Sequence, residues 1–364
     1  MKTINAAIIG LVLGTVIAVS ACREESPSAE TTAAASLTLM TFNVENLFDN
    51  VDDPEKDDGT YLALADKQND AHRAACAVIE VRSWRDDCLK LDWNDEVIDR
   101  KLRVVAEAIL QVGNGRGPDI IALQEVENIR ILERLRTDYL AAAEYLPAVL
   151  IEGNDLRGID VAFLSRLPLA GPPVLHPLEF EGIPEERVRD TRGILQVDFE
   201  LPDGSRLTGF AVHFPAPFHP TEMREVAYAH LNRLLAALPA ARPAFAAGDF
   251  NTTATEDASK DMLERFARPN WTVAHELGCD ECPGTQYYAR EDSWSFLDMI
   301  LWSPSRDRGV DATWTVRADS VQLGNKTAAQ VSNESTPKRF EAADGTGVSD
   351  HWPLVATIEL KQKQ

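Results

Sequence analysis

Two short polar clusters stand where apolar segments of this chain end or begin. Residues 248–251 (GDFN) close an apolar run at residues 244–247, and residues 349–351 (SDH) precede another at residues 355–358. Carboxylates bind hard divalent cations, and amide and imidazole groups orient and neutralise phosphate oxygens. Acidic, amide and imidazole side chains at strand ends therefore indicate metal-assisted hydrolysis of a phosphoester.

Four further clusters of the same kind lie along the chain, at residues 41–46 (TFNVEN), 122–126 (ALQEV), 210–214 (FAVHF) and 295–300 (SFLDMI). Each has an ordinary explanation when taken alone. Asn43 can end a strand in a turn, Glu125 can complement the dipole of a following helix, and Thr252 or Thr253 can cap a helix. A single histidine such as His213 is more often a satisfied core residue. The combination of six clusters is far more specific than any one of them, and it indicates a catalytic site.

Taken in order, the six clusters resemble the endonuclease/exonuclease/phosphatase superfamily, which has the DNase-I-like fold. The motifs that carry the resemblance are TFNVEN, LQEV, the HF strand end, GDFN, SFLD and SDHWPL, and the resemblance covers residues 37–360. It implies an α/β (α+β) four-layer sandwich, in which two mixed β-sheets pack together and helices lie on the outside. It also implies a phosphoesterase that depends on Mg²⁺, or on Mn²⁺ or Ca²⁺.

The resemblance assigns roles to individual residues. Glu125 is the expected principal metal ligand, with Asn43 and Asp350 also at the metal site. Asp249 and Asn251 are expected to position the attacking water and the substrate phosphate. One firm carboxylate suffices for Mg²⁺, because this ion keeps water and phosphate oxygens as its other ligands.

Two histidines complete the chemistry that the resemblance implies. His351 matches the terminal histidine of the family, Asp298 matches the carboxylate that orients it, and His213 matches the second histidine. A histidine held by a carboxylate keeps one tautomer and becomes a better proton acceptor or cationic stabiliser. We therefore expect His351 to pair with Asp298, and both histidines to take part in proton transfer.

Two further candidates lie directly before or at the start of strand-like segments. Asp160 is the expected partner of His213, although a surface charge or a turn residue has the same signature. Arg192 can clamp a phosphate with two hydrogen bonds, or form a surface salt bridge instead. The family often has a tyrosine near the position of residues 154–157, where this chain has none. The chain therefore departs from the family at that phosphate contact.

Strand and helix patterns alternate between residues 37 and 360. Strands are expected at residues 37–44, 119–124, 160–165, 193–200, 206–213, 243–248, 297–302 and 353–360. Some of them alternate and others are continuously apolar, which is typical of strands covered on one or both faces. Apolar residues with helical spacing lie between them, most clearly at residues 223–238. No repeat or long linker divides this region, so we expect one domain at residues 37–360.

Residues 49–99 form a polar, acidic insertion in this domain. Its aspartates can bind calcium, but they lack the spacing of a regular calcium loop, so a solvated acidic loop is the preferred interpretation. Four cysteines lie beyond the N-terminal segment. An even number in an exported protein indicates disulfides, and Cys76–Cys88 and Cys279–Cys282 are the simplest pairs. Zinc binding is the alternative, although only one CxxC motif is present.

The N-terminus has the pattern of a bacterial export signal. Lys2 precedes an apolar stretch at residues 4–19, and small residues precede Cys22. We expect residues 1–21 to be a signal peptide, Cys22 to be lipidated and residues 22–36 to be a flexible tether. The alternative is an ordinary signal peptide or membrane anchor with an incidental cysteine. The protein is therefore expected to be exported and lipid-anchored at the bacterial cell envelope, on the periplasmic or outer-membrane face.

The formal net charge is −22, from 36 Lys and Arg and 58 Asp and Glu residues in a chain of 364. This charge gives no long-range attraction to nucleic acid, yet it does not exclude a nuclease whose cleft is locally cationic or metal-filled. The leading hypothesis is a monomeric, metal-dependent phosphodiesterase that acts on nucleic acid. The alternatives are a phosphatase or phospholipid phosphodiesterase, acting on inositol phosphates or sphingomyelin, and a catalytically silent surface-binding module.

Overall fold

The computed structural model describes residues 35–362, with the exception of residues 54, 308 and 310. The expected signal peptide (residues 1–21), the lipidation site Cys22 and all but the last two residues of the expected tether (residues 22–36) lie outside the described residues. Among the helices of the described part, none has the length and apolar character needed to cross a membrane.

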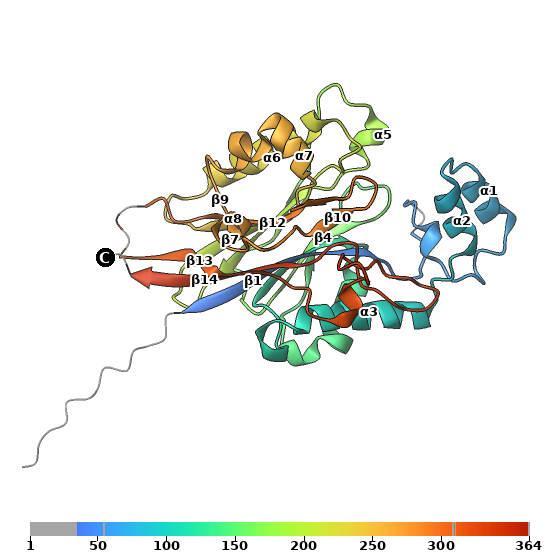
Figure 1. Cartoon of the computed structure of the whole chain (residues 1–364), viewed down its shortest axis with the longest axis horizontal. Helices are drawn as coiled ribbons and strands as arrows, with labels where there is room; N and C mark the ends of the chain where they lie inside the picture. Colours follow the sequence, from blue (N-terminus) through green and yellow to red (C-terminus); the bar gives the residue numbers. More distant parts are fainter. Residues whose placement is uncertain (1–34, 54, 308, 310, 363–364) are drawn as a thin grey trace, which may run out of the picture. The chain divides into compact units, whose positions relative to one another are not determined.

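Two six-stranded sheets form the centre of the domain (Figure 1). The first contains, in spatial order, β13 (Ala312–Leu323), β14 (Leu354–Gln362), β1 (Ser36–Leu47), β2 (Ile120–Val126), β4 (Asp160–Ser165) and β3 (Val149–Leu150). The second contains β5 (Val174–His176), β6 (Ile194–Glu200), β7 (Arg206–His213), β8 (Ala244–Asp249), β12 (Asp298–Ser303) and β9 (Thr272–Val273). Both sheets are mixed, because β1–β2 and β7–β8 are parallel pairs among antiparallel ones. A hairpin of β10 (Gln286–Tyr288) and β11 (Ser293–Ser295) is separate from both sheets.

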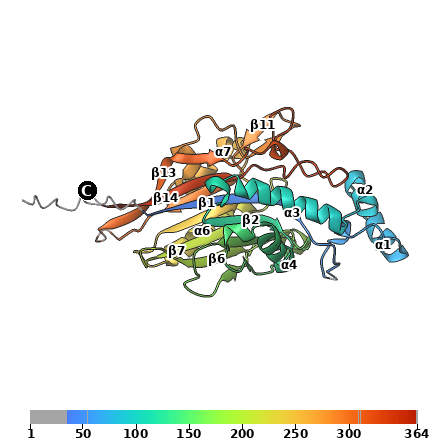
Figure 2. The ribbon, with the colours of Figure 1, turned by 90° about the horizontal axis from the view of Figure 1, so that it is seen from below.

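Helices cover the outer face of each sheet (Figures 1 and 2). α3 (Asp95–Leu110) and α4 (Ile129–Arg134) pack on the first sheet, and α6 (Thr221–Ala237) packs on the second. The other helices are α1 (Asp70–Ala77), α2 (Arg82–Lys90), α5 (Glu185–Val188), α7 (Ala254–Lys260) and α8 (Ala274–Leu277). Short 3-10 or π turns occur at η1 (Gly59–Tyr61), η2 (Gly113–Gly115), η3 (Leu135–Tyr139), η4 (Ala141–Ala143), η5 (Leu263–Ala267) and η6 (Ala328–Gln330). The layers follow the order helix, sheet, sheet, helix, so the predicted fold class is confirmed.

The continuously apolar strands are explained by burial of both faces of each sheet. In β1, Leu37 and Leu39 face the core between the two sheets, whereas Met40 and Phe42 face the core under α3. Successive side chains of a strand point to opposite faces, so a strand with two buried faces reads as a continuous apolar run. The same alternation points Asn43 into the space between the sheets.

All eight predicted strands are present, and those at residues 160–165 and 206–213 have the predicted bounds. The twelve-residue strand β13 is not predicted from the sequence. Its register shifts between Arg317 and Gln322, and few of its side chains are buried. An edge strand with an interrupted alternation carries a weak period-two signal.

The acidic insertion contains α1 and α2 and ends before the predicted boundary. α3 begins at Asp95, and the side chain of Asn94 caps it by accepting the N–H groups of Glu96 and Val97. Residues 95–99 therefore belong to a core helix.

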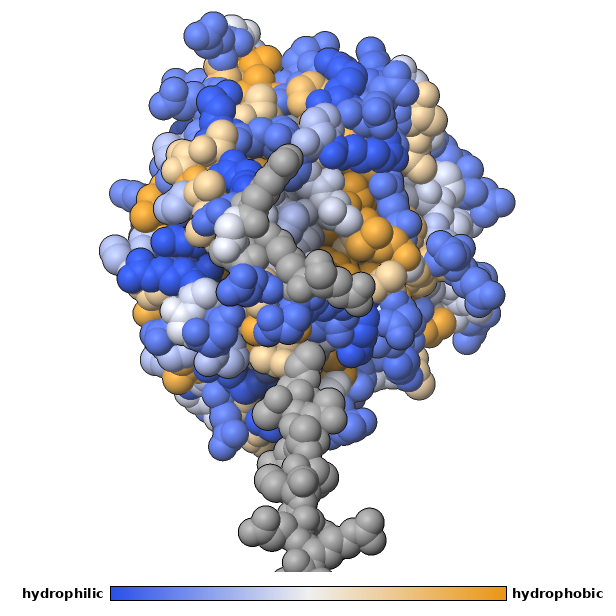
Figure 3. All heavy atoms as spheres, turned by 90° about the vertical axis from the view of Figure 1, so that its left-hand side faces the viewer, coloured by the Kyte–Doolittle hydropathy of each residue, from blue (hydrophilic) through white to orange (hydrophobic). Residues whose placement is uncertain are grey.

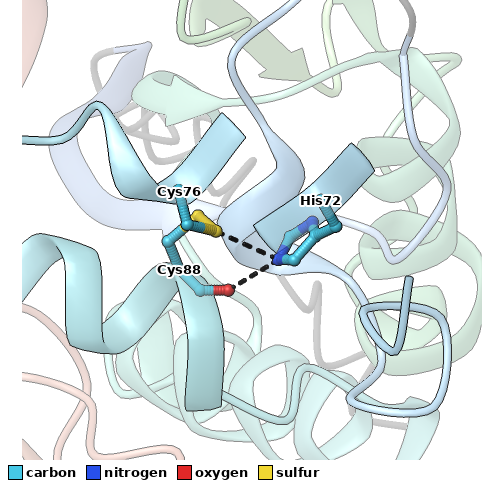
Figure 4. Close-up of side chains that lie close together, drawn as sticks. All are labelled: His72, Cys76 and Cys88. Atoms are coloured by element: carbon cyan, nitrogen blue, oxygen red, sulfur yellow. Dashed lines mark hydrogen bonds between the residues drawn. A yellow bond between two sulfur atoms is a disulfide. The ribbon is translucent and has the colours of Figure 1, made fainter. Parts of the chain in front are cut away.

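The two predicted disulfides, Cys76–Cys88 and Cys279–Cys282, are formed. The first joins α1 to α2 (Figure 4), where Nε2 of His72 lies 3.2 Å from Sγ of Cys76 and 2.9 Å from the carbonyl oxygen of Cys88. Sulfur atoms in disulfides are not thiolate ligands, so the zinc alternative is excluded. Within the described residues, the acidic side chains of the insertion bring no three ligand atoms within 4.8 Å of one another.

β1 begins and β14 ends at the same end of the domain, because Ser36 pairs with Glu359. Figure 3 shows that this face carries mainly hydrophilic residues with small apolar groups between them. From here β1 runs along the first sheet toward the opposite end of the domain (Figure 1). The polar strand ends lie at that opposite end.

Candidate active site

The polar strand ends meet in the space between the two sheets. In β8, Phe245 and Ala247 face the core between the sheets, and Asp249 continues the same face. Asp298, at the start of β12, and His213, at the end of β7, are paired with Asp249 on the neighbouring strands. Three chemically active side chains therefore lie side by side on the second sheet.

A distortion at the ends of β1 and β2 brings residues of the first sheet into the same space. The β1–β2 register is interrupted between Asn43 and Leu47, and Glu45, Asn46 and Glu125 have φ angles of 50°, 57° and 63°. Non-glycine residues rarely adopt this left-handed conformation. The odd-numbered residues of β2 face α3, so a regular strand would point Glu125 away from the site. The bulge redirects its side chain toward Asn43.

Asn43 links the two sheets. Its Nδ2 donates to Oε1 of Glu125 at 3.3 Å and to Oδ2 of Asp249 at 3.2 Å. Its Oδ1 accepts the N–H of Glu45 at 3.0 Å. The side chain therefore presents its NH₂ group to both carboxylates and holds the expected metal ligand of one sheet next to the reactive carboxylate of the other.

Glu125 is ionised. Burial alone raises its pKa, but the positive charges of Arg157 and Arg192 outweigh that effect and hold the pKa at about 2. Its Oε2 accepts the N–H of Asn46 at 3.0 Å, and Arg157 donates to Oδ1 of the same asparagine at 2.7 Å. A partly buried, ionised carboxylate fits the principal cation ligand that the sequence implies.

The expected contact between His351 and Asp298 is present. Nδ1 of His351 lies 2.6 Å from Oδ2 of Asp298, whose backbone N–H donates to Oγ1 of Thr285 at 3.0 Å. Ser349 accepts the backbone N–H of His351 at 3.1 Å and donates its hydroxyl to the carbonyl oxygen of Asn43. Burial opposes the charged imidazole, but the charge and the hydrogen bond of Asp298 outweigh it and raise the pKa of His351 well above its usual range. His351 is therefore protonated at neutral pH.

His213 has the opposite protonation state. Burial, and then the positive charge of Arg192, lower the pKa of His213 well below its usual range. Its Nε2 lies 3.6 Å from Oδ2 of Asp249. Its buried Nδ1 has no hydrogen-bond partner among the residues that the structure describes. His213 is therefore a neutral imidazole that can take up a proton.

The expected pairing of Asp160 with His213 is wrong. Oδ1 of Asp160 accepts the backbone N–H of Gly153 at 2.9 Å. Asp160 is the first residue of β4 in the first sheet, and its bond to Gly153 fixes the preceding loop. His213 is the last residue of β7 in the second sheet. Burial raises the pKa of Asp160 to about 7.

Arg192 is buried rather than exposed, and its Nε lies 3.2 Å from Oδ2 of the buried Asp155. The sequence leaves a phosphate clamp and a surface salt bridge open, and the ion pair that forms is an internal one. The positive charge still acts on the site, since it lowers the pKa values of both His213 and Glu125.

Asp249 and Asn251 are held against each other. Oδ1 of Asp249 accepts the backbone N–H of Asn251 at 2.8 Å, and Nδ2 of Asn251 donates to the carbonyl oxygen of Phe214 at 2.9 Å. Burial raises the pKa of Asp249 to about 7, although the charge of His351, whose Nε2 is 4.0 Å from its Oδ2, opposes the rise. A carboxyl group with a pKa near neutral suits proton exchange with water.

Asp350 is a partly exposed carboxylate of the site. Its backbone N–H donates to Oε2 of Glu45 at 3.0 Å, and its Oδ2 lies 3.5 Å from a guanidinium nitrogen of Arg339. Its Oδ1 is 3.9 Å from Nε2 of His351. Arg339 also donates from Nε to Oε1 of Glu45 at 2.5 Å.

Three residues of this site are not singled out by the sequence. Glu45 belongs to the TFNVEN cluster, so the strand-end pattern contains a signal for it. Arg157 and Arg339 lie in loops with no regular spacing, and nothing in the local sequence separates them from surface arginines. Arg157 lies in the segment where the family often has its tyrosine.

The side chains fit a divalent cation. Asp249, Asp298 and His351 bring one oxygen or nitrogen atom each within 4.8 Å of one another, and the two carboxylates of this group can bind a cation while His351 stays protonated. Oδ1 of Asp298 is buried and has no hydrogen-bond partner among the described residues. Glu125 lies next to this group through their shared partner Asn43. Buried carboxylate oxygens without N–H partners are satisfied by a hard cation, and oxygen donors suit Mg²⁺, Mn²⁺ or Ca²⁺.

Comparison with known proteins agrees with this geometry. The sequence pattern of the Endonuclease/Exonuclease/phosphatase family matches residues 40–351. A family member from Bacteroides vulgatus is 18% identical, with a TM-score of 0.53 over 90% of this chain and 100% of that chain. The protein from Beutenbergia cavernae is also 18% identical, with a TM-score of 0.53 over 89% and 72%. D. rerio TDP2 complexed with a single strand DNA product is 16% identical, with a TM-score of 0.52 over 89% and 99%. These identities show a shared fold. No curated protein matches the chain.

Proposed function

This chain belongs to the endonuclease/exonuclease/phosphatase family and is a metal-dependent phosphoesterase; from that premise we propose that it is a nuclease anchored at the bacterial cell envelope. The observation that carries the proposal is a set of arginines around the carboxylates of a chain with a net charge of −22. Arg157, Arg192 and Arg339 act on or contact the site residues. Positive side chains are therefore gathered around the site although the protein as a whole is strongly acidic.

Two of these arginines are exposed to solvent. Arg157 is exposed beside Glu125, and the side chain of Arg339 is 62% exposed at Asp350. A small phosphomonoester needs only one phosphate-binding position. Two exposed arginines beside the carboxylates suit a substrate that carries more than one phosphate, such as a nucleic acid.

The protonation states of the side chains support a division of labour. A bound cation supplies charge neutralisation at the phosphate and lowers the pKa of bound water. Asp249 and Asn251 position the attacking water, whose oxygen forms a bond to phosphorus while the bond to the leaving oxygen breaks. Neutral His213 can accept a proton, and protonated His351, held by Asp298, can donate one to the leaving oxygen. The attacking water thus loses one proton to His213, and the leaving oxygen gains one proton from His351.

The site lies far from the start of β1, where the expected tether joins the domain. Ser36 lies at the start of this strand, and Asn43 lies about 23 Å further along it at the usual strand rise. The site therefore lies at the opposite end of the strand from the point where the expected tether joins the domain.

A substrate panel tests the proposal. Purified protein is incubated with plasmid DNA, single-stranded DNA, RNA, inositol phosphates and sphingomyelin vesicles, each with Mg²⁺, Mn²⁺ or Ca²⁺ and with chelator. We expect cleavage of nucleic acid that stops with chelator and is lost in Glu125→Gln. Hydrolysis of inositol phosphates or sphingomyelin with intact nucleic acids contradicts the choice of substrate. Full activity of Glu125→Gln contradicts the site.

Anchoring is tested separately. We expect the wild-type protein to fractionate with membranes and to incorporate labelled fatty acid, and Cys22→Ser to lose the label. A wild-type protein without lipid contradicts the proposal about anchoring and leaves the substrate question unaffected.

A further inference from the structure

Phe218 is an exposed aromatic residue on the loop that leaves the active site. Its side chain is 73% exposed, and it lies five positions after His213 in the segment 214–220, which connects β7 to α6. This loop begins at a site residue, because Nδ2 of Asn251 donates to the carbonyl oxygen of Phe214. The ring of Phe218 is therefore presented to solvent on a loop whose first residue contacts the site.

Buried polar contacts hold this loop in one conformation. Arg224, which is only 2% exposed, donates from one guanidinium nitrogen to the carbonyl oxygens of Pro215 at 3.1 Å and Ala216 at 2.8 Å. Its other nitrogens bind both carboxylate oxygens of Glu256. Three prolines in the segment further restrict its backbone.

A second contact orients the ring itself. The rings of Phe218 and His219 lie 4.3 Å apart between centroids. His219 is buried, and its Nε2 lies 3.0 Å from Oδ2 of Asp190. Asp190 is two positions before Arg192, whose charge acts on both His213 and His219. Phe218 thus packs on a histidine that the charge of Arg192 reaches.

We propose that Phe218 contacts the substrate and stacks on a nucleobase next to the scissile phosphate. A loop fixed by a buried ion pair loses little entropy on binding, so its exposed ring is preorganised for a flat partner. Every base has a π-face, so stacking selects single-stranded nucleic acid without reading its sequence. The inference rests on the proposed nuclease function and names its substrate class.

The test compares two single-stranded oligonucleotides that differ only in the bases on either side of the cleavage position. One carries normal nucleotides, and the other carries abasic residues on both sides of the cleavage position. We expect Phe218→Ala to lower kcat/KM about 10-fold on the normal oligonucleotide and less than about 2-fold on the abasic one. Phe218→Trp should keep most of the activity. Trp84→Ala, which removes another exposed aromatic side chain on α2, is the matched control and should leave both rates unchanged.

Each outcome decides the question. An equal fall on both oligonucleotides means that Phe218 supports the loop rather than a base, and no fall on either means that it does not touch the substrate. Both results overturn the inference and leave the nuclease function standing, because the wild type still cleaves. Intact oligonucleotides with the wild type under all three ions overturn the proposed function and this inference together.

Discussion

Two histidines on either side of Asp249 have opposite protonation states because their neighbours differ. His351 contacts the carboxylate of Asp298 directly, whereas His213 is buried near Arg192 and has no carboxylate on its Nδ1. Environments that push pKa values apart separate the roles of proton donor and proton acceptor. The division of roles is therefore set by one carboxylate on β12.

Replacing that carboxylate tests this division. We expect Asp298→Asn to lower kcat by about 10³-fold or more, with a small effect on KM. The pKa of His351 should fall toward its ordinary value, so activity should decline with rising pH at a lower pH than in the wild type. The measurement is kcat across a pH series, with the exposed Asp319→Asn as control. A pH profile identical to that of the wild type contradicts the role of Asp298.

The pKa of Asp160 gives a prediction about stability. Burial raises it to about 7, above the ordinary value of about 3.9. The stability that the neutral carboxyl group contributes is fully present below about pH 4 and is lost as the pH rises through 7. We expect Asp160→Asn to raise the free energy of unfolding by roughly 2 kcal/mol at pH 8, and to have little effect at pH 4.

Urea unfolding at both pH values measures this difference. The variant should keep most of its phosphoesterase activity, because Asp160 binds Gly153 and not His213. A large loss of activity in Asp160→Asn would restore Asp160 as a catalytic residue. A stability change of the same size at both pH values contradicts the assigned pKa.

At the scale of elements, the β10–β11 hairpin positions the catalytic pair. Thr285, directly before β10, is fully buried; its hydroxyl accepts the N–H of Asp298, and its carbonyl oxygen accepts the N–H of Trp352. Gln286 forms a bridge with His351. The hairpin belongs to neither large sheet, yet it contacts the strand ends that carry both members of the pair.

Removing the Thr285 hydroxyl should therefore affect both stability and rate. Thr285→Val leaves the buried N–H of Asp298 without an acceptor, which costs about 1–3 kcal/mol. We expect a lower melting temperature and a kcat reduced about 10-fold through displacement of Asp298. Thr285→Ser keeps the acceptor and should stay close to the wild type in both measurements. Equal behaviour of the two variants would show that the hydroxyl is not what matters.

The core strands and their polar ends are predictable from sequence, because apolar runs and the residues that close them are local patterns. Asp249 and His351 are found in this way. The redirection of Glu125 by a bulge and the bridge made by Asn43 depend on how two sheets meet, which no local pattern contains. Arg157 reaches the site because its loop is held by Lys56, a residue far away in the sequence. Lys56 donates to the carbonyl oxygens of Gly153 and Asp155.

At the scale of the molecule, the concentration of carboxylates makes stability depend on a divalent cation. Glu125, Asp249, Asp298 and Asp350 belong to one site. A ligand that binds only the folded state stabilises it by about 2.7 kcal/mol at 100 times its Kd. We expect saturating Mg²⁺ or Mn²⁺ to raise the melting temperature by about 5 °C, and chelator to reverse the rise.

The matched variant for this measurement is Glu125→Gln, which keeps the shape of the side chain and loses its charge. Its melting temperature should respond much less to either ion. Thermal unfolding monitored without substrate keeps the result independent of activity. An equal shift in both proteins would place the cation elsewhere.

Because Asn43 bonds to residues of both sheets, the rate of the reaction depends on how the two sheets pack together. One amide spans both layers, so the gap between Glu125 and Asp249 can stay constant only while the layers keep their alignment. Aromatic contacts such as that between Phe163 and Phe245 maintain this alignment. They lie in the apolar core between the two sheets, away from the reacting atoms. The packing of the apolar core between the sheets thus sets the separation of the two carboxylates that the reaction uses.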